Sequence, residues 1–247
     1  MVNSQSESNN SGNDARTLTV VMPAYNEEEN IELAVQEVRV EVLDKVPDSS
    51  LIVVNDGSKD RTGEILARMA VSEPRLTVIE TANGGHGPSL IKGLNKAQSD
   101  YVFLVDSDMQ IPLSCFPALW RAAADADAVF GIRENRQDPK LRLVLSALVS
   151  GIVGTIFGVT LKDTNVPCKV FKRKIWTELF SKLNDHSLLI PSIMIAIYTK
   201  RHNYKVVDMP VPHRARTKGE GSLNLGKLFQ VCQKSLGQLM QHKKNIL

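Results

Sequence analysis

Few of the features that mark secreted, zinc-binding or nucleic-acid-binding proteins occur in this sequence. Its three cysteines, Cys115, Cys168 and Cys232, are odd in number and far apart, which argues against a disulfide framework and against a zinc-ligand spacing. No apolar stretch follows a basic start, so we expect a protein that is not exported and that resides in the cytoplasm. Aromatic residues make up 5% of the chain and no known nucleic-acid-binding motif is present, so nucleic acid is not an expected partner.

Composition divides the chain into three regions. Residues 1–16 are rich in Ser, Asn and Gly and nearly free of apolar residues, which predicts a disordered tail. Residues 17–225 have the length of one elaborated α/β domain, and no internal repeat divides them. Residues 226–247 predict an amphipathic, basic C-terminal helix.

Two features indicate a membrane surface. After position 200 the chain holds nine Lys or Arg and two acidic residues, a local net charge of +7 within a total of +3, which suits anionic lipid or a phosphorylated substrate. Residues 143–161 contain no charged residue and reach the length of a membrane-spanning helix, about 17 to 25 residues. Because Asp163, Lys169 and Arg173 follow at once, we expect a buried or interfacial helix rather than a transmembrane one.

Three apolar segments, residues 18–22, 51–54 and 101–105, are each followed by polar residues and then by a helix pattern, which predicts alternating strands and helices. In an open α/β sheet, ligands bind at the carboxyl ends of the strands, so we expect these polar residues to share one edge. The apolar positions at helical spacing after the first two segments are Ile31, Ala34, Val35, Val38, Val42, Ile65, Leu66 and Met69.

The third segment ends in two carboxylates and an amide. Asp106, Asp108 and Gln110 alternate along the chain, so their side chains can share a face. Oxygen ligands of this kind suit Mg²⁺ or Mn²⁺, which leave coordination positions open for phosphate oxygens. The alternative interpretation is that Asp106 and Asp108 only cap the helix that begins near Leu113.

A glycine-rich loop, residues 83–88, lies between a strand and a helix. Glycines before a helix can offer backbone amides to a phosphate or a base, here at Gly85, but the spacing is not that of a dinucleotide fingerprint. A nicotinamide cofactor is therefore not expected. His86 in this loop is either a nucleotide contact or an ordinary loop histidine.

Five segments in this order resemble the family 2 glycosyltransferases of the GT-A fold, and most closely the polyprenyl-phosphate glycosyltransferases such as the dolichyl-phosphate mannose synthases. The resemblance extends over residues 18–225 and implies an α/β fold with a mostly parallel central sheet flanked by helices. One departure, Val-Pro-Cys-Lys at 166–169 where the mannose synthases tend to have Ser-Gly-Phe-Arg, weakens any inference about the donor sugar. The matching segments are residues 23–27, 55–62, 83–87, 106–110 and 213–216.

The resemblance also assigns roles to individual residues. Asp106, Asp108 and Gln110 would hold the divalent ion, and Arg133 would clamp a phosphate or diphosphate. The loop after residue 212 would close over phosphates, with Arg214 and Arg216 adding positive charge. The residues implied in nucleotide binding are Pro23, Tyr25, Glu27, Asp56, Gly85, His86 and Asp106.

The implied reaction is the inverting transfer of a sugar from a nucleotide-diphosphate sugar, dependent on Mg²⁺ or Mn²⁺. The expected acceptor is a polyprenyl phosphate of dolichyl or undecaprenyl type, because a phosphate monoester, with a second pKa near about 6, is already ionised and needs no general base. Two alternatives stay open. One is a hydroxyl acceptor on a saccharide or natural product, with Asp163 as the candidate base, and the other is a non-catalytic nucleotide-sugar-binding subunit of a membrane complex.

The expected partners are the nucleotide-sugar donor, the lipid phosphate, and a membrane surface or a membrane-anchoring subunit. We expect the protein to be peripheral on the cytoplasmic face of a membrane. The nucleobase, GDP or UDP, the sugar and the lipid length depend on the shape of the pocket, which the sequence does not reveal.

Overall fold

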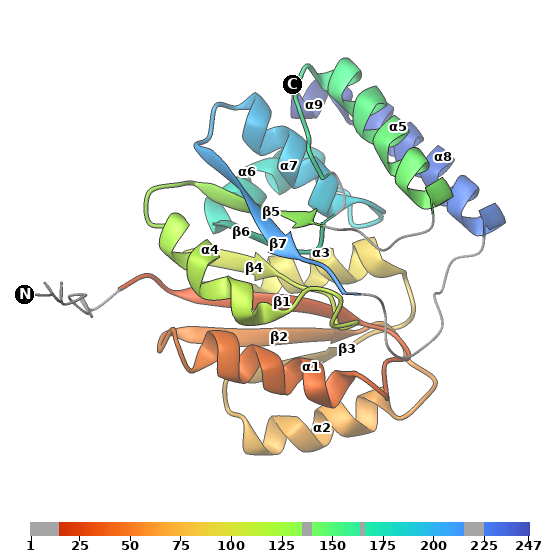
Figure 1. Cartoon of the computed structure of the whole chain (residues 1–247). Coiled ribbons are helices and arrows are strands. Elements are labelled where there is room, and N and C mark those ends of the chain that lie inside the picture. The colour runs from red at the N-terminus through yellow and green to blue at the C-terminus, as the bar shows by residue number, and fades with distance from the viewer. Residues whose placement is uncertain (1–14, 135–139, 164–165, 215–224) are drawn as a thin grey trace, which may run out of the picture.

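The computed structural model describes residues 15–134, 140–163, 166–214 and 225–247, with side chains from 148 and 230 onward in the two helices that begin at 140 and 225. Its centre is one sheet in the order β3-β2-β1-β4-β6-β5-β7 (Figure 1). Neighbouring strands are parallel except at β6, which is antiparallel to β4 and β5. The predicted mostly parallel α/β sheet is confirmed. The strands are β1 (Leu18–Ala24), β2 (Ser49–Asn55), β3 (Leu76–Glu80), β4 (Tyr101–Leu104), β5 (Ala128–Glu134), β6 (Lys169–Lys172) and β7 (Val206–Pro212).

Helices cover both faces of the sheet, and each face has its own hydrophobic cluster. On one face lie α1 (Ile31–Val38), its continuation η1 (Arg39–Leu43), α2 (Thr62–Ser72), η2 (Leu113–Cys115) and α4 (Phe116–Ala122). The other face is covered by α3 (His86–Lys96), α5 (Lys140–Phe157), α6 (Arg173–Leu183), α7 (Pro191–Arg201), α8 (Leu225–Gln241) and α9 (Lys243–Ile246).

The periodicity of the sequence explains which side chains enter which cluster. In β1, Val20 and Met22 join the cluster beneath α1, while Val21 between them joins the opposite one, as the two-residue period of a strand requires. The helix predicted from Ile31 onward is confirmed, and its apolar stripe is fully buried. On the opposite face α3 packs closely because it has Gly93, where an added Cβ would lie 2.4 Å from Val21 Cγ1.

The helix α7 and the residue Arg16 were not predicted as the structure shows them. The helix α7 has no amphipathic pattern, because its residues from Pro191 to Thr199 are all buried, and the sequence analysis assigned no helix there. Arg16, placed by composition at the end of the tail, lies 4.1 Å from the Trp120 ring and donates a hydrogen bond to the Trp120 carbonyl. Residues 1–14 lie outside the described residues.

The uncharged segment at 143–161 forms most of α5. In the parts of the chain that the structure describes, no helix combines the length and the apolar character needed to cross a bilayer.

Candidate active site

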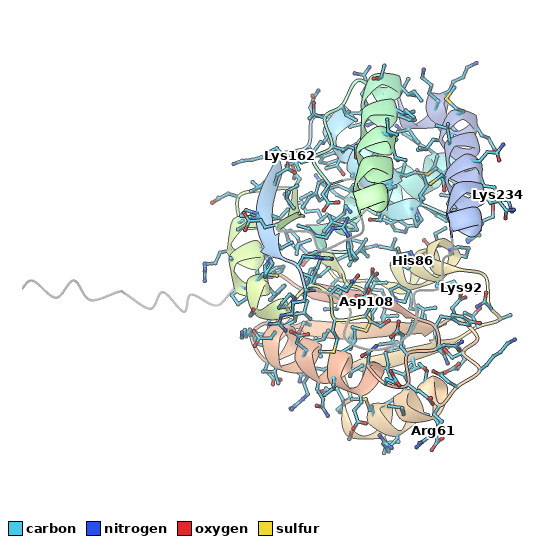
Figure 2. All side chains as sticks on the ribbon, turned by 45° about the vertical axis from the view of Figure 1, so that its right-hand side comes forward. Arg61, His86, Lys92, Asp108, Lys162 and Lys234 are labelled. Carbon is cyan, nitrogen blue, oxygen red and sulfur yellow. The ribbon has the colours of Figure 1, made fainter. Side chains whose placement is uncertain are left out.

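The carboxyl ends of β1, β2 and β4 lie at one edge of the sheet, as predicted. Parallel pairing places Ala24 beside Asn55 and Val21 beside Leu104, so Asp56 and Asp106 leave the sheet close together. Figure 2 labels Asp108 and His86 at this edge. The candidate site therefore consists of loops that follow three parallel strands, together with the start of α3.

Asp56 holds the glycine-rich loop in place. It is only 3% exposed, its Oδ1 accepts a hydrogen bond from the Gly84 amide at 2.9 Å, and its Oδ2 accepts one from the Gly85 amide at 2.8 Å. Gly85 has a φ of 92°, a left-handed conformation that a side chain would strain. Asp56 thus shapes the loop, and its predicted direct contact with a nucleotide stays a prediction.

His86 links this loop to the carboxylates. Its Nε2 lies 3.1 Å from Asp106 Oδ1, and its ring is about half exposed. Partial burial lowers the pKa of His86, but the hydrogen bond with Asp106 and the charges of Asp106, Asp108 and Asp56 outweigh it, so the pKa is raised above its ordinary value. The His86 imidazole is therefore protonated more readily than an ordinary histidine, and it lies beside a carboxylate of the site.

The loop after β4 presents Asp106 and Asp108 together. Both line one small cavity with Glu37 and Pro167, and the Gln110 amide donates to Asp108 Oδ1 at 3.1 Å across a turn in which Met109 has a φ of 57°. The alternative interpretation as helix caps is wrong. Neither η2 nor α4 has a side-chain cap, and the Leu113 amide donates instead to Glu37 Oε1 at 3.0 Å.

The donor set fits a hard divalent cation. Within the described residues, no three His, Cys, Asp or Glu side chains are placed to hold a metal ion, so a protein-only cage is absent from that part of the chain. Mg²⁺ and Mn²⁺ do not need such a cage, because one or two carboxylates and substrate phosphates complete their coordination. Asp106 and Asp108 would supply such a partial set, and the predicted part of the Gln110 side chain in it stays a prediction.

Arg133 and Asp163 are paired with each other. Arg133 Nε donates to Asp163 Oδ2 at 2.8 Å and Nη2 donates to Oδ1 at 2.8 Å, and the two side chains are 9% and 3% exposed. This bidentate, buried geometry is the strong form of an ion pair. The predicted phosphate clamp and the candidate base are therefore engaged with one another, which the sequence analysis did not foresee.

The loop after β7 reaches the carboxylate loop through its backbone. The Arg214 amide donates to the Gln110 carbonyl at 2.8 Å, and the Arg214 residue is exposed. This contact brings Arg214 to the predicted site. Arg216 lies outside the described residues, so its role stays a prediction.

The remaining predicted nucleotide residues follow β1. Pro23 pairs with Val54 inside the sheet, and Tyr25 is 38% exposed just beyond the strand. Glu27 is buried in the turn before α1, where its carbonyl accepts a hydrogen bond from the Ile31 amide at 2.8 Å. Its amide also donates to the Thr62 hydroxyl at 2.8 Å, which joins α1 to α2. Glu27 therefore helps to hold the start of α1 against α2, and its predicted contact with a nucleotide stays a prediction.

The burial of Lys169, in β6, is a feature that the sequence motifs did not indicate. This lysine is fully buried, and its Nζ donates to the Val166 carbonyl at 2.5 Å and to the Ser192 hydroxyl at 2.9 Å. Burial lowers its pKa to about 8, against the opposing influence of Asp163. The available signal was alternation: in the strand Lys169–Lys172, Lys169 shares a face with the core residue Phe171.

The buried lysine makes stability depend on pH. Between its folded pKa of about 8 and its ordinary value of 10.5, the unfolded chain retains a proton that the folded chain has released, so raising the pH favours folding. We expect the free energy of unfolding to gain a rising component in this window, and Lys169→Met should remove it. Urea unfolding of both proteins from about pH 7 to about pH 11 measures the difference. Lys96→Met, at an exposed position of α3, is the matched control. Parallel curves for wild type and Lys169→Met would contradict the assignment.

Comparison with known proteins identifies the family. Residues 19–183 match the family described as Glycosyl transferase family 2, so the chain belongs to that family. The family resemblance read from the motifs is therefore confirmed.

Several curated relatives carry the same name. An undecaprenyl-phosphate 4-deoxy-4-formamido-L-arabinose transferase of Photorhabdus laumondii is 26% identical over 220 residues, which cover 87% of this chain and 66% of that protein. The transferase of the same name from Pseudomonas aeruginosa is 29% identical over 217 residues and is covered to 62%. The chain thus spans slightly less than two thirds of the length of these relatives.

Solved structures support the fold. Glucosyl-3-phosphoglycerate synthase from Mycobacterium tuberculosis, in complex with Mn²⁺, uridine diphosphate and glucosyl-3-phosphoglycerate, superposes with a TM-score of 0.67 at 21% identity. The match covers 92% of this chain and 80% of the synthase. The expected GT-A fold is confirmed.

Proposed function

We propose that this protein transfers a sugar, with inversion, from a nucleotide-diphosphate sugar to a polyprenyl phosphate in the presence of Mg²⁺ or Mn²⁺. The observation that carries the proposal is the convergence of Asp106 and Asp108 with His86 and with the glycine loop held by Asp56. The names of the curated relatives support an undecaprenyl-type lipid phosphate, and the Mn²⁺ and uridine diphosphate in a structural neighbour support the donor and the ion.

The proposed roles follow from the charge that develops during transfer. Breaking the bond between the sugar and its diphosphate builds negative charge on the leaving group, while the sugar ring gains oxocarbenium character. A divalent ion, when bound, supplies Lewis-acid stabilisation of that leaving group. Asp106, Asp108 and Gln110 would hold the ion. The Gly84–Gly85 loop would lie against the nucleotide, and Arg214 and Arg216 would add positive charge at the phosphates.

The pairing of Arg133 with Asp163 favours a phosphate acceptor over a hydroxyl acceptor. A hydroxyl needs a general base, and Asp163 was the candidate. Both of its carboxylate oxygens accept hydrogen bonds from Arg133, at 2.8 Å each, which makes it a poor proton acceptor. A lipid phosphate, already ionised near neutral pH, needs no such base.

A direct comparison of acceptors tests the proposal. The protein would be incubated with Mn²⁺ and a panel of UDP- and GDP-sugars, with either a polyprenyl phosphate or the matched polyprenol that lacks the phosphate, and products identified by mass spectrometry. We expect a sugar-phosphate-lipid product from the first lipid and none from the second. Transfer to polyprenol or to a soluble hydroxyl acceptor would favour the hydroxyl alternative, and nucleotide binding without any turnover would favour the non-catalytic subunit.

The helices α5 and α8 are the surface that we place against an anionic membrane, on its cytoplasmic face. They are neighbours in both views (Figures 1 and 2). Residues 140–162 and 225–247 contain basic residues and no acidic residue. Exposed apolar side chains lie on both helices, at Leu148, Ile152, Leu236 and Met240. Apolar side chains combined with basic charge are typical of interfacial helices. An anchoring subunit stays a prediction.

Vesicle binding tests this surface. The protein should pellet with anionic vesicles at low salt and be partly released by high salt, because lipid attraction to Lys and Arg is screened within a Debye length. Leu148→Asp and Ile152→Asp should each weaken pelleting, whereas Leu33→Asp, at an equally exposed leucine of α1, should not. Equal pelleting of all three variants, or no pelleting of the wild type, would contradict the placement.

A further inference from the structure

Residues 184–190 form the loop between α6 and α7. This loop lies between the C-terminal helix α8 and the start of α3 and contacts both. This loop and α8 lie beyond the residues that match the family, 19–183, so family membership assigns no role to their contact. On one side the loop is bonded to α8, and on the other it lies against the glycine-rich loop of the candidate site.

On the α8 side, two polar side chains hold the loop. The Leu189 amide donates to Gln238 Oε1 at 2.8 Å, and Gln238 Nε2 donates to the Ser187 carbonyl at 3.1 Å. His242 is 5% exposed, and its Nε2 lies 2.9 Å from Asp185 Oδ2. The other Asp185 oxygen accepts hydrogen bonds from the Ser187 amide and hydroxyl, at 2.8 and 2.7 Å. The loop is therefore fastened at both of its ends.

The ionisation of Asp185 suits this contact. Burial raises the pKa of the Asp185 carboxyl, but the hydrogen bonds from Ser187 and His242 outweigh it, so the pKa lies below its usual value. Asp185 is therefore ionised at neutral pH, and its two oxygens accept the hydrogen bonds from Ser187 and His242.

On the α3 side, the loop touches the backbone at Gly87. A Cβ added to Gly87 would lie 2.1 Å from the Leu188 carbonyl oxygen and 2.6 Å from the Leu189 carbonyl carbon, distances that no side chain could adopt. Leu188 itself is fully buried. Gly87 directly follows His86, and the residues before it, Gly84 and Gly85, are those bonded to Asp56.

We propose that Gln238 and His242 are positioning residues for nucleotide binding: they hold loop 184–190 against Gly87 and so fix residues 84–87 in their binding conformation. Glycine has the greatest backbone freedom of any residue, and Asp56 holds only the amides of Gly84 and Gly85, so the contact at Gly87 adds a second restraint on residues 84–87. A loop ordered before binding loses less entropy when the ligand arrives. This inference rests on the proposed function, because it concerns the same nucleotide site.

The test weakens the attachment of loop 184–190 to α8 without changing any residue of the nucleotide site. Gln238→Leu keeps the approximate shape and deletes both hydrogen bonds to the loop, while Gln233→Leu, at an exposed position of the same helix, is the matched control. In the ligand-free protein, hydrogen exchange of the backbone amides should accelerate at 185–190 and also at 82–92 in Gln238→Leu alone. The dissociation constants of UDP and of GDP, each with Mn²⁺, should rise by about tenfold for the nucleotide that the wild type binds, as expected for the loss of one to two hydrogen bonds. The turnover number at saturating donor should change less than the KM for the donor.

Faster exchange at 185–190 with unchanged exchange at 82–92 and unchanged nucleotide affinity would overturn the inference, because the contact would then be merely structural. If Gln238→Leu does not fold, Gly87→Ala tests the contact from the other side: its methyl group must displace the Leu188 carbonyl, and it should give the same exchange pattern and the same loss of affinity. A wild type that binds neither UDP nor GDP would refute the proposed function, whereas the exchange measurement would still decide whether α8 orders the loop.

Discussion

Asp108→Ala and Asp106→Asn should each abolish sugar transfer while leaving the protein folded. Both residues follow β4 at the edge of the sheet, neither is fully buried, and both line the same cavity. If they hold the divalent ion, removing one carboxylate removes several kcal/mol of stabilisation from the departing diphosphate, a loss of about 10³-fold or more in turnover.

Three measurements decide this prediction: turnover with excess Mn²⁺, Mn²⁺-dependent binding of UDP or GDP, and thermal unfolding. Asp125→Asn, at an exposed aspartate after α4, is the matched control and should behave as wild type. Near-normal turnover of either site variant at saturating Mn²⁺ would remove Asp106 and Asp108 from the ion site. A large drop in unfolding temperature would instead indicate a structural role.

Arg133→Met should strongly destabilise the protein. The substitution leaves the Asp163 carboxylate, 3% exposed, without the bidentate partner that neutralises it. Breaking a buried ion pair from one side costs about 3 to 5 kcal/mol, whereas replacing both partners by apolar residues often costs much less. We therefore expect the double variant Arg133→Met, Asp163→Leu to be more stable than the sum of the single changes implies.

Urea unfolding of the two single variants and of the double variant gives the coupling free energy between Arg133 and Asp163. Arg121→Met, at an exposed arginine of α4, controls for the loss of an arginine as such. Additive effects within about 0.5 kcal/mol would mean that the pair contributes no mutual stabilisation. Because the pair couples both residues, comparing their single variants cannot identify the acceptor, and the polyprenyl phosphate and polyprenol comparison is the cleaner test.

Local pattern was sufficient for much of this protein. The apolar runs of β1, β2 and β4 and the stripe of α1 were predictable because strand and helix periods are short-range properties of the chain. The shared edge followed from the rule that polar residues at the ends of parallel strands meet. Family motifs then supplied the roles proposed for Asp106 and Asp108.

Contacts between residues far apart in sequence could be seen only in the tertiary structure. The pairing of Arg133 with Asp163, the bonds from Asp56 to the glycine loop, and the contact of α8 with loop 184–190 all join distant segments. No local period encodes such contacts, because they depend on how helices and strands pack after they form. The same limit applies to α7, whose burial is set by neighbours on every side rather than by a pattern of its own. The sequence therefore determined which helices and strands form and which edge of the sheet holds the candidate site. Packing determined which charged side chains form ion pairs with one another, as Arg133 does with Asp163.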